Sequence, residues 1–79
     1  MSVMAQGALN AKTKELIALG IAVADHCVPC IRAHTSGCLE EGATRDEIME
    51  AASVAVVMAG GPAYVHLPVV VETLDTLEG

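Results

Sequence analysis

The sequence predicts an all-α fold, with a small core of about four helices in a single domain that covers residues 1–79. Apolar residues recur at helical spacing along most of the chain. A capping box that begins at Thr44 marks a helix start. The β-branched run at residues 69–71 could form a strand, but no second strand exists to pair with it. Helices are therefore favoured throughout, and 79 residues leave no room for a second domain.

Two helices are expected in the first half of the chain, separated by a short break. The first spans about Asn10 to Asp25, with Asn10 as its N-cap. The second begins between Cys27 and Pro29, because proline is accepted in the first helical turn, where its missing N–H would have no partner. It ends at Glu41, and the glycine that follows suits the C′ position.

Two more helices are expected in the second half. Thr44 and Glu47 form the capping box of the third helix, in which each side chain accepts a hydrogen bond from the other residue's amide. This helix ends at the Gly-Gly-Pro of residues 60–62. A fourth segment runs from residue 62 to about residue 77, and Pro68 implies a kink or an irregular start near it.

The composition indicates self-association. The chain is 53% hydrophobic and only 1% aromatic, so most of its apolar residues are small aliphatic ones that let helices approach closely. This is more apolar side chain than one small domain can bury, and a core of this size supplies little stability by itself. The sequence therefore predicts a homo-oligomer.

The distribution of charge argues against two classes of partner. The net charge is −6, and residues 46–79 contain six acidic residues but no Lys or Arg, so nucleic-acid binding is not expected. The uncharged stretch at residues 51–71 is long enough to span a bilayer, but glycines and prolines interrupt it, so no membrane is expected either. The N-terminus lacks the pattern of a signal peptide. A cytoplasmic protein is expected, in which cysteines are more often catalytic or metal-binding than structural.

The segment with the clearest chemistry is C-V-P-C followed by a histidine. Cys27 and Cys30 are three residues apart at a helix start, roughly 5–6 Å from each other, which lies within the range for a disulfide. A helix N-terminus also favours thiolate over thiol. His34 lies one turn beyond Cys30, within reach directly or through one water. The alternatives are a structural disulfide, or a zinc site that uses these three residues with His26 or Glu15 as the fourth ligand.

Glu15 can belong to the same site only if the chain reverses. In one continuous helix it would lie about 18 Å from Cys27 and could not contact the cysteines. A turn over residues 25–29, where the helix-start signals fall, would bring it back. Glu15 then either points outward beside Lys12, or is buried and paired with His34. A carboxylate is costly in so apolar a helix without a partner, which favours the buried pair.

The pattern E-x11-C-x2-C-x3-H, with an apolar helix before it and H-T-x-G-C-L-E-E-G-A-T-R-D-E-I-x-E after it, resembles the carboxymuconolactone decarboxylase family. It is most similar to the alkylhydroperoxidase D-like branch, which carries a redox CxxC. The resemblance extends from about Lys12 to Gly61, most of the chain. The four spaced groups of this pattern and the G-A-T-x-x-E-I turn that follows them are more specific than a lone CxxC.

The resemblance implies an all-helical fold assembled into hexamers or trimers, and a thiol peroxidase or disulfide reductase with antioxidant activity of the peroxiredoxin type. Cys30 matches the cysteine that attacks peroxide, and Cys27 the one that resolves it as a disulfide. Glu15 and His34 match the relay that takes the proton from Cys30. The implied partners are a peroxide substrate and a dithiol electron donor, such as a lipoyl-bearing or thioredoxin-like protein. No cofactor beyond the Cys27–Cys30 disulfide is implied.

The chain also departs from the family pattern. The hydroperoxidase has a histidine immediately before its second cysteine, where this chain has Pro29, and His26 instead precedes the first cysteine. The C-V-P-C sequence is also similar to the C-x-P-C of thioredoxin-like proteins, in which the first cysteine is the nucleophile. The helix start thus favours Cys27 as the attacking residue, whereas the family favours Cys30. A lactone decarboxylase or a purely structural oligomeric module is the remaining alternative, and the CxxC argues against both.

The other notable residues have structural interpretations. Cys38 lies about 12 Å along the helix from Cys30, too far for a disulfide, and is expected to be a small buried residue. His66 and Tyr64 could line the site from another helix or subunit, but a place in the helix core or on the surface is favoured. Met49 and Met58 are expected to fill the core.

Overall fold

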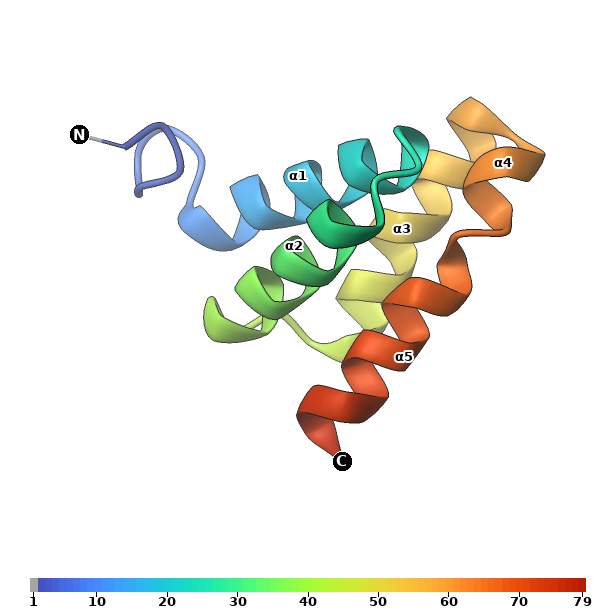
Figure 1. Cartoon of the computed structure of the whole chain (residues 1–79). Coiled ribbons are helices and arrows are strands. Elements are labelled where there is room, and N and C mark those ends of the chain that lie inside the picture. The colour runs from blue at the N-terminus through green and yellow to red at the C-terminus, as the bar shows by residue number, and fades with distance from the viewer. Residues whose placement is uncertain (1) are drawn as a thin grey trace.

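The computed structural model describes residues 2–79, and all of their regular secondary structure is helical (Figure 1). The helices are, in chain order, α1 (Ala11–Ala24), α2 (Val28–Glu40), α3 (Arg45–Ala59), α4 (Gly61–Tyr64) and α5 (Leu67–Glu78). Because α4 is a single turn, there are four longer helices, and the predicted all-α fold is confirmed. None of these helices combines the length and the apolar character that crossing a membrane requires.

Local capping signals place the first three helices where they were expected. At the start of α1, Asn10 Oδ1 accepts a hydrogen bond from the Thr13 amide at 2.7 Å. The capping box of α3 is complete: the Glu47 amide donates to Thr44 Oγ1 at 3.1 Å, and the Thr44 amide donates to Glu47 Oε1 at 2.8 Å. After α2, Gly42 has a φ of 87°, the left-handed conformation for which a C′ glycine is suited.

The predicted fourth segment is divided between α4 and α5. Gly60, with a φ of 76°, ends α3, and α4 makes one turn before the chain bends at Val65 and His66. Pro68 lies in the first turn of α5, so the irregular start expected near it is confirmed. The β-branched run at residues 69–71 is helical.

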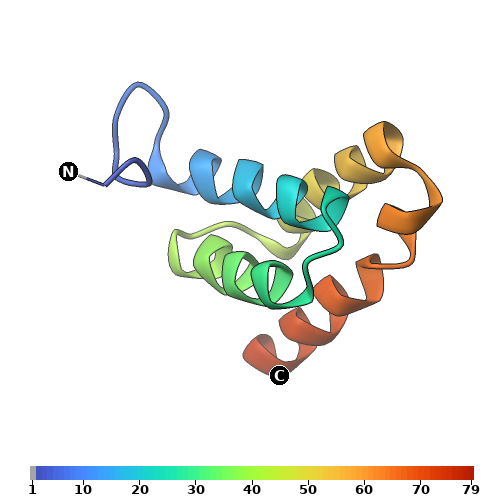
Figure 2. The same ribbon diagram turned by 45° about the horizontal axis from the view of Figure 1, so that its top comes forward.

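The packing of α1 places the middle of that helix against α2. α1 packs on both α2 and α3, and α5 packs across α2 and α3. Figures 1 and 2 show α1 and α2 side by side and running in opposite directions. The largest side chains buried between the helices are Leu19, Val23, Ile31, Ile48, Val70 and Leu74. Since α1 and α2 are antiparallel, a residue early in α1 faces the second half of α2.

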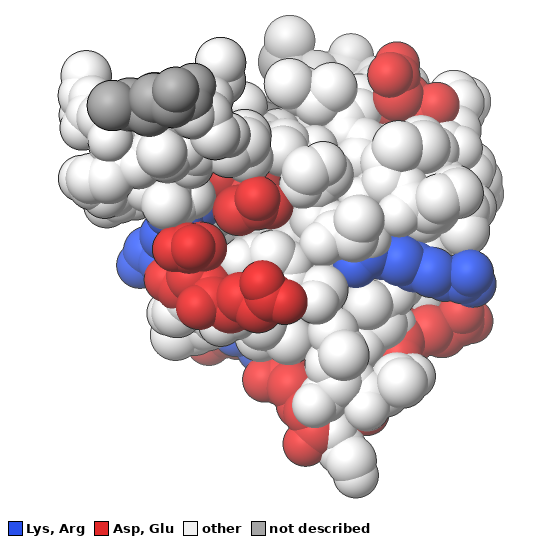
Figure 3. Space-filling view, turned by 60° about the vertical axis from the view of Figure 1, so that its left-hand side comes forward, with Lys and Arg blue, Asp and Glu red and all other residues white. Residues whose placement is uncertain are grey.

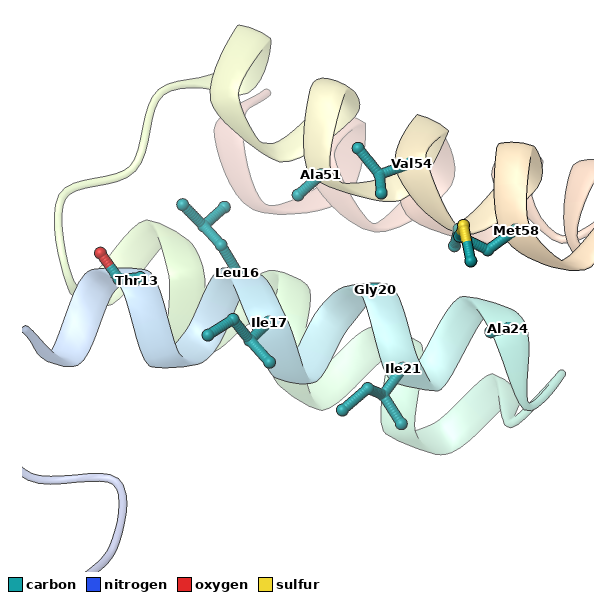
Figure 4. A pocket seen from close by; sticks show the side chains of 10 residues that line it. Thr13, Leu16, Ile17, Gly20, Ile21, Ala24, Ala51, Val54 and Met58 are labelled. Carbon is teal, nitrogen blue, oxygen red and sulfur yellow. The ribbon is translucent and has the colours of Figure 1, made fainter. Parts of the chain in front are cut away.

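An apolar groove lies between α1 and α3 on the outside of the molecule (Figure 4). Its volume is about 460 Å³, and its lining is apolar apart from the hydroxyl of Thr13. Ile21 on one side is 60% exposed, and Met58 on the other is 80% exposed. The expectation that Met58 fills the core is therefore wrong, whereas Met49 packs against the core as predicted.

Charged groups are mostly acidic and mostly at the surface. On the face seen in Figure 3, acidic side chains gather in patches and Lys and Arg are few. Arg45, at the start of α3, donates hydrogen bonds to Asp75 at 2.9 Å and to Glu78 at 3.3 Å. These two contacts fasten the end of α5 to the start of α3.

Candidate active site

The turn between α1 and α2 positions the first cysteine. α1 ends in a Schellman motif, in which the His26 amide donates to the Val23 carbonyl at 3.2 Å and the Cys27 amide donates to the Ala22 carbonyl at 3.1 Å. His26 occupies the left-handed position of this motif with a φ of 58°, where glycine is usual because a side chain costs about 1–2 kcal/mol. Cys27 is also the N-cap of α2, so both helices hold its backbone.

Cys27 and Cys30 are joined by a disulfide, with their Cα atoms 5.2 Å apart. This agrees with the short distance that their spacing at a helix start predicts. Cys30 is exposed, whereas Cys27 is half-buried. Cys38 is free and buried, as predicted. Of the two disulfide residues, Cys30 is thus the more exposed to solvent.

Glu15 lies in the contact between α1 and α2 and pairs with His34. Its Oε2 is 2.8 Å from His34 Nδ1, and its side chain is only 17% exposed. The pairing with His34, one of the two alternatives for Glu15, is therefore confirmed, and the pair is partly buried. Lys12 instead donates to Glu47 at 3.0 Å. The chain reversal over residues 25–29 makes this pairing reachable, as the sequence predicts.

The carboxylate assigns the tautomer of His34. An ionised carboxylate only accepts hydrogen bonds, so Nδ1 of His34 carries the proton and donates to Glu15. In the neutral ring, the nitrogen that can take a proton is then Nε2. His34 follows Cys30 by four residues on α2, about one turn along the same face. The three residues have the order of nucleophile, base and orienting group that acid–base sites use.

Gly37 provides the space that the Glu15 carboxylate occupies, a feature that the sequence reasoning missed. A Cβ on Gly37 would lie 2.7 Å from Cδ of Glu15, closer than a real Cβ comes to another atom. Gly37 follows His34 by three residues, so both lie on the face of α2 that meets α1. A glycine inside a helix costs about 1 kcal/mol relative to alanine. The presence of Gly37 within α2 is therefore the sequence signal that could have indicated a close contact at this position.

Cys38 is kept out of thiol chemistry. Burial, and to a smaller extent the nearby charge of Glu15, raises the pKa of the Cys38 thiol to about 12. A thiol with that pKa stays protonated at neutral pH, and the thiolate is the nucleophilic form. Cys38 therefore does not compete with Cys27 and Cys30 for thiol chemistry at neutral pH.

Two other histidines, one of which directly precedes Cys27 in the chain, contact each other. The ring of His26 stacks on that of His66, with centroids 5.1 Å apart and planes inclined at 22°. Tyr64 is 63% exposed, so its expected place on the surface is confirmed. His66 was expected away from the site, but it contacts the residue that precedes Cys27. No local sequence pattern links two histidines that are this far apart along the chain.

The residues considered for a zinc site are not arranged as a set of ligands. The sulfurs of Cys27 and Cys30 are bonded to each other, and His34 is paired with Glu15. The ring of His26 is stacked on another imidazole. Within residues 2–79, no three His, Cys, Asp or Glu side chains converge where they could hold a metal ion.

The fold and the site define a small all-helical protein with a CxxC pair at a helix start. The comparison with family models agrees with this description. The model of the carboxymuconolactone decarboxylase family matches residues 1–71, so the chain belongs to this family. A protein of unknown function encoded in the cox locus of Paracoccus denitrificans is 44% identical over 77 residues. An uncharacterised protein of Cupriavidus necator is 37% identical over 71 residues. These matches cover 98% and 90% of this chain, which spans 69% and 63% of the two relatives.

Solved structures of family members have the same fold. A carboxymuconolactone decarboxylase family protein from Thermotoga maritima, for which a part in an antioxidative response has been suggested, superposes with a TM-score of 0.92 at 39% identity. That match covers 96% of this chain and 78% of the other. The apo form of a family member from Legionella pneumophila gives a TM-score of 0.88, also at 39% identity, over 94% of this chain and 66% of the other. The family and the fold indicated by the sequence are thus confirmed.

Proposed function

We propose that this protein is a thiol-dependent peroxidase or disulfide reductase of the peroxiredoxin type, which uses the Cys27–Cys30 pair and a Glu15–His34 proton relay. The observation that carries the proposal is the partly buried Glu15 carboxylate 2.8 Å from His34 Nδ1, one turn from Cys30. An isolated CxxC has no need of such a pair. A carboxylate–imidazole pair beside a cysteine is suited to remove the thiol proton.

The function of the proposed Glu15–His34 relay is to remove the proton of the Cys30 thiol. An ordinary cysteine has a pKa near 8.5, so only a few per cent is thiolate at neutral pH. His34 takes the proton of the Cys30 thiol on Nε2, while Glu15 holds the ring and stabilises the imidazolium. The start of α2, at which both cysteines lie, adds a modest stabilisation of the thiolate.

The proposed reaction uses both cysteines once per turnover. The Cys30 thiolate attacks the outer oxygen of a peroxide, so an S–O bond forms, the O–O bond breaks, and the leaving oxygen takes a proton from His34. Cys27 then attacks the resulting sulfenic acid, which forms the disulfide and releases water. A dithiol donor, such as a lipoyl-bearing or thioredoxin-like protein, reduces the disulfide. The greater exposure of Cys30 supports its assignment as the attacking residue.

The proposed reaction requires no cofactor other than the disulfide. We propose that the protein works in the reducing cytoplasm. Its test is an assay of peroxide turnover with dihydrolipoamide or a thioredoxin system as donor, together with a count of free thiols. We expect peroxide to remove two of the three thiols reversibly and to leave Cys38 free. A protein that keeps all three thiols in excess peroxide would instead be a structural module, and one that retains bound zinc after purification would be a metal-binding module.

We further propose that copies of this chain assemble through the α1–α3 groove into a homo-oligomer, with a hexamer expected and a trimer as the alternative. The apolar, uncharged lining of the groove supports self-association, and so does the exposure of Ile21 and Met58 along it. Sedimentation should show one oligomeric species at micromolar concentration. Ile21→Asp should dissociate it, whereas a wild-type protein that sediments as a stable, folded monomer would refute the assembly.

A further inference from the structure

The His26–His66 pair adjoins Cys27 through the chain, because His26 is the residue before it, and the pair has no part in the peroxide chemistry proposed above. His26 directly precedes Cys27, and its ring stacks on that of His66 at 5.1 Å between centroids. His26 also occupies a left-handed position at which glycine is usual, so this side chain is present where the backbone disfavours it. A disfavoured residue held next to a reactive group points to a role for its side chain.

The hydrogen bond of His66 leaves one of its nitrogens open. His66 Nδ1 lies 2.7 Å from the Pro62 carbonyl oxygen, which can only accept, so Nδ1 carries the proton and donates. In the neutral ring, Nε2 of His66 is then able to take a further proton. Neither ring of the pair forms a salt bridge within the part of the chain that the structure describes.

Within residues 2–79, no carboxylate is paired with either ring of the stack, so the pair has no acidic partner that would neutralise a positive charge on it. The second half of α3, residues 51–59, contributes no titratable group to this end of the molecule. The titratable or charged residues nearest to the pair along α1, α2, α4 and α5 are Asp25, Cys27, Cys30, Arg32, His34, Tyr64 and Glu72. Among residues 2–79, none of these is hydrogen-bonded to either ring.

We propose that the His26–His66 pair supplies positive charge and a proton to Cys27 when a dithiol donor reduces the Cys27–Cys30 disulfide, an inference that rests on the redox function proposed above. The donor thiolate attacks the sulfur of the exposed Cys30, the S–S bond breaks, and Cys27 leaves with the bonding electron pair as a thiolate. The protonated histidine pair gives its proton to this thiolate. A disulfide opens faster when its leaving sulfur is a better-stabilised thiolate.

The second half of the step completes the electron balance. The remaining donor thiol loses its proton to solvent and attacks the donor's own sulfur in the mixed disulfide. This attack releases Cys30 as a thiolate and the donor as a disulfide, so the donor is oxidised by two electrons and the CxxC is reduced by two. His34 serves the oxidative half of the cycle at Cys30, whereas His26 and His66 serve the reductive half at Cys27.

The test compares wild type with His26→Gly in the full chain, by the rate at which dithiothreitol reduces the disulfide across the pH range in which histidine titrates. Glycine is suited to the left-handed backbone, so this variant keeps the turn and removes only the ring. We expect reduction of His26→Gly to be about tenfold slower near pH 6 and equal to wild type near pH 9, where the rings are neutral. Equal rates throughout, or a loss that does not change with pH, would overturn the proposal.

A second variant keeps the ring stack but removes its proton. His66→Phe should show the same pH-dependent loss, and a wild-type profile in this variant would refute a role for the pair. Tyr64→Phe is the matched control, because Tyr64 lies two residues before His66 and is uncharged over this pH range. The disulfide of this variant should be reduced at the wild-type rate. Because dithiothreitol needs no peroxide, these rates remain informative even if peroxide turnover is not found. Failure of the proposed function and failure of this inference are thus distinguishable.

Discussion

The histidines on the two sides of the CxxC differ in the partner that each ring has. His34 is hydrogen-bonded at 2.8 Å to the carboxylate of Glu15, within the contact between α1 and α2. His26 stacks on a second imidazole, His66, and neither ring has an acidic partner among the described residues. The two rings are thus held by different chemistry, an acidic hydrogen-bond acceptor for His34 and a second imidazole for His26.

The largest expected effect is the loss of the base. His34→Ala should slow the reaction of the reduced protein with peroxide by roughly 10²–10⁴-fold, the usual contribution of a positioned acid–base group. The double variant with Glu15→Gln should be little slower than either single one, because the two residues act as a unit. Single-turnover loss of thiols measures this. Ser36→Ala, two residues further along α2 than His34, is the control and should react like wild type. If the losses in the double variant are additive, Glu15 and His34 do not act as a unit.

A smaller effect is expected from a change that moves the carboxylate without removing it. Gly37→Ala places a Cβ where the Glu15 carboxylate lies, and because that carboxylate ends a flexible side chain, it should shift rather than unfold the protein. We expect a roughly ten- to hundredfold slower peroxide reaction, as misplaced acid–base groups show, with little change in the free energy of unfolding.

The matched control for this variant is Gly20→Ala on α1, where an added Cβ would lie at an ordinary 3.6 Å from the Ala51 carbonyl oxygen. That variant should react like wild type. If both glycine variants react like wild type, the position of the Glu15 carboxylate has no part in the rate.

The smallest effect is expected at the N-cap of α3, which is hydrogen-bonded to neither the Glu15–His34 pair nor the His26–His66 pair. Thr44→Ala removes the cap of α3 and should lower the free energy of unfolding by about 1 kcal/mol, while the peroxide reaction stays unchanged.

The Thr44 amide and, secondarily, Lys12 lower the pKa of Glu47 from its ordinary value of 4.5. The stabilisation by ionised Glu47 is therefore present above that value and lost as the pH falls through the lower pKa of the folded state. Urea denaturation at neutral and acidic pH should show this loss in acid.

The parts of the fold that depend on neighbouring residues could be predicted from the sequence. The capping box at Thr44, the proline at position 29 and the glycine after Glu41 are local signals, and each helix end they indicate is present. The Glu15–His34 pair could also be predicted, because the break before Pro29 reverses the chain and a buried carboxylate needs a partner.

Contacts between distant segments could not be predicted in this way. The stacking of His66 on His26 depends on how α4 returns to the end of α1, which no short pattern specifies. Met58 was expected to fill the core, yet it lies on the exposed groove. Hydrophobicity alone does not distinguish a residue buried within the subunit from one that lies on an apolar face.

The relay is tested most directly by the rate at which prereduced Glu15→Gln reacts with peroxide between about pH 5 and pH 9, a range that brackets the ordinary pKa values of histidine and cysteine. Glutamine keeps the size of the side chain but cannot stabilise an imidazolium. We expect a loss of roughly 10²–10⁴-fold near neutral pH, while Lys12→Ala, on the same helix but paired with Glu47, should match wild type. If Glu15→Gln reacts like wild type across this range, Glu15 has no part in activating Cys30 and the relay is wrong.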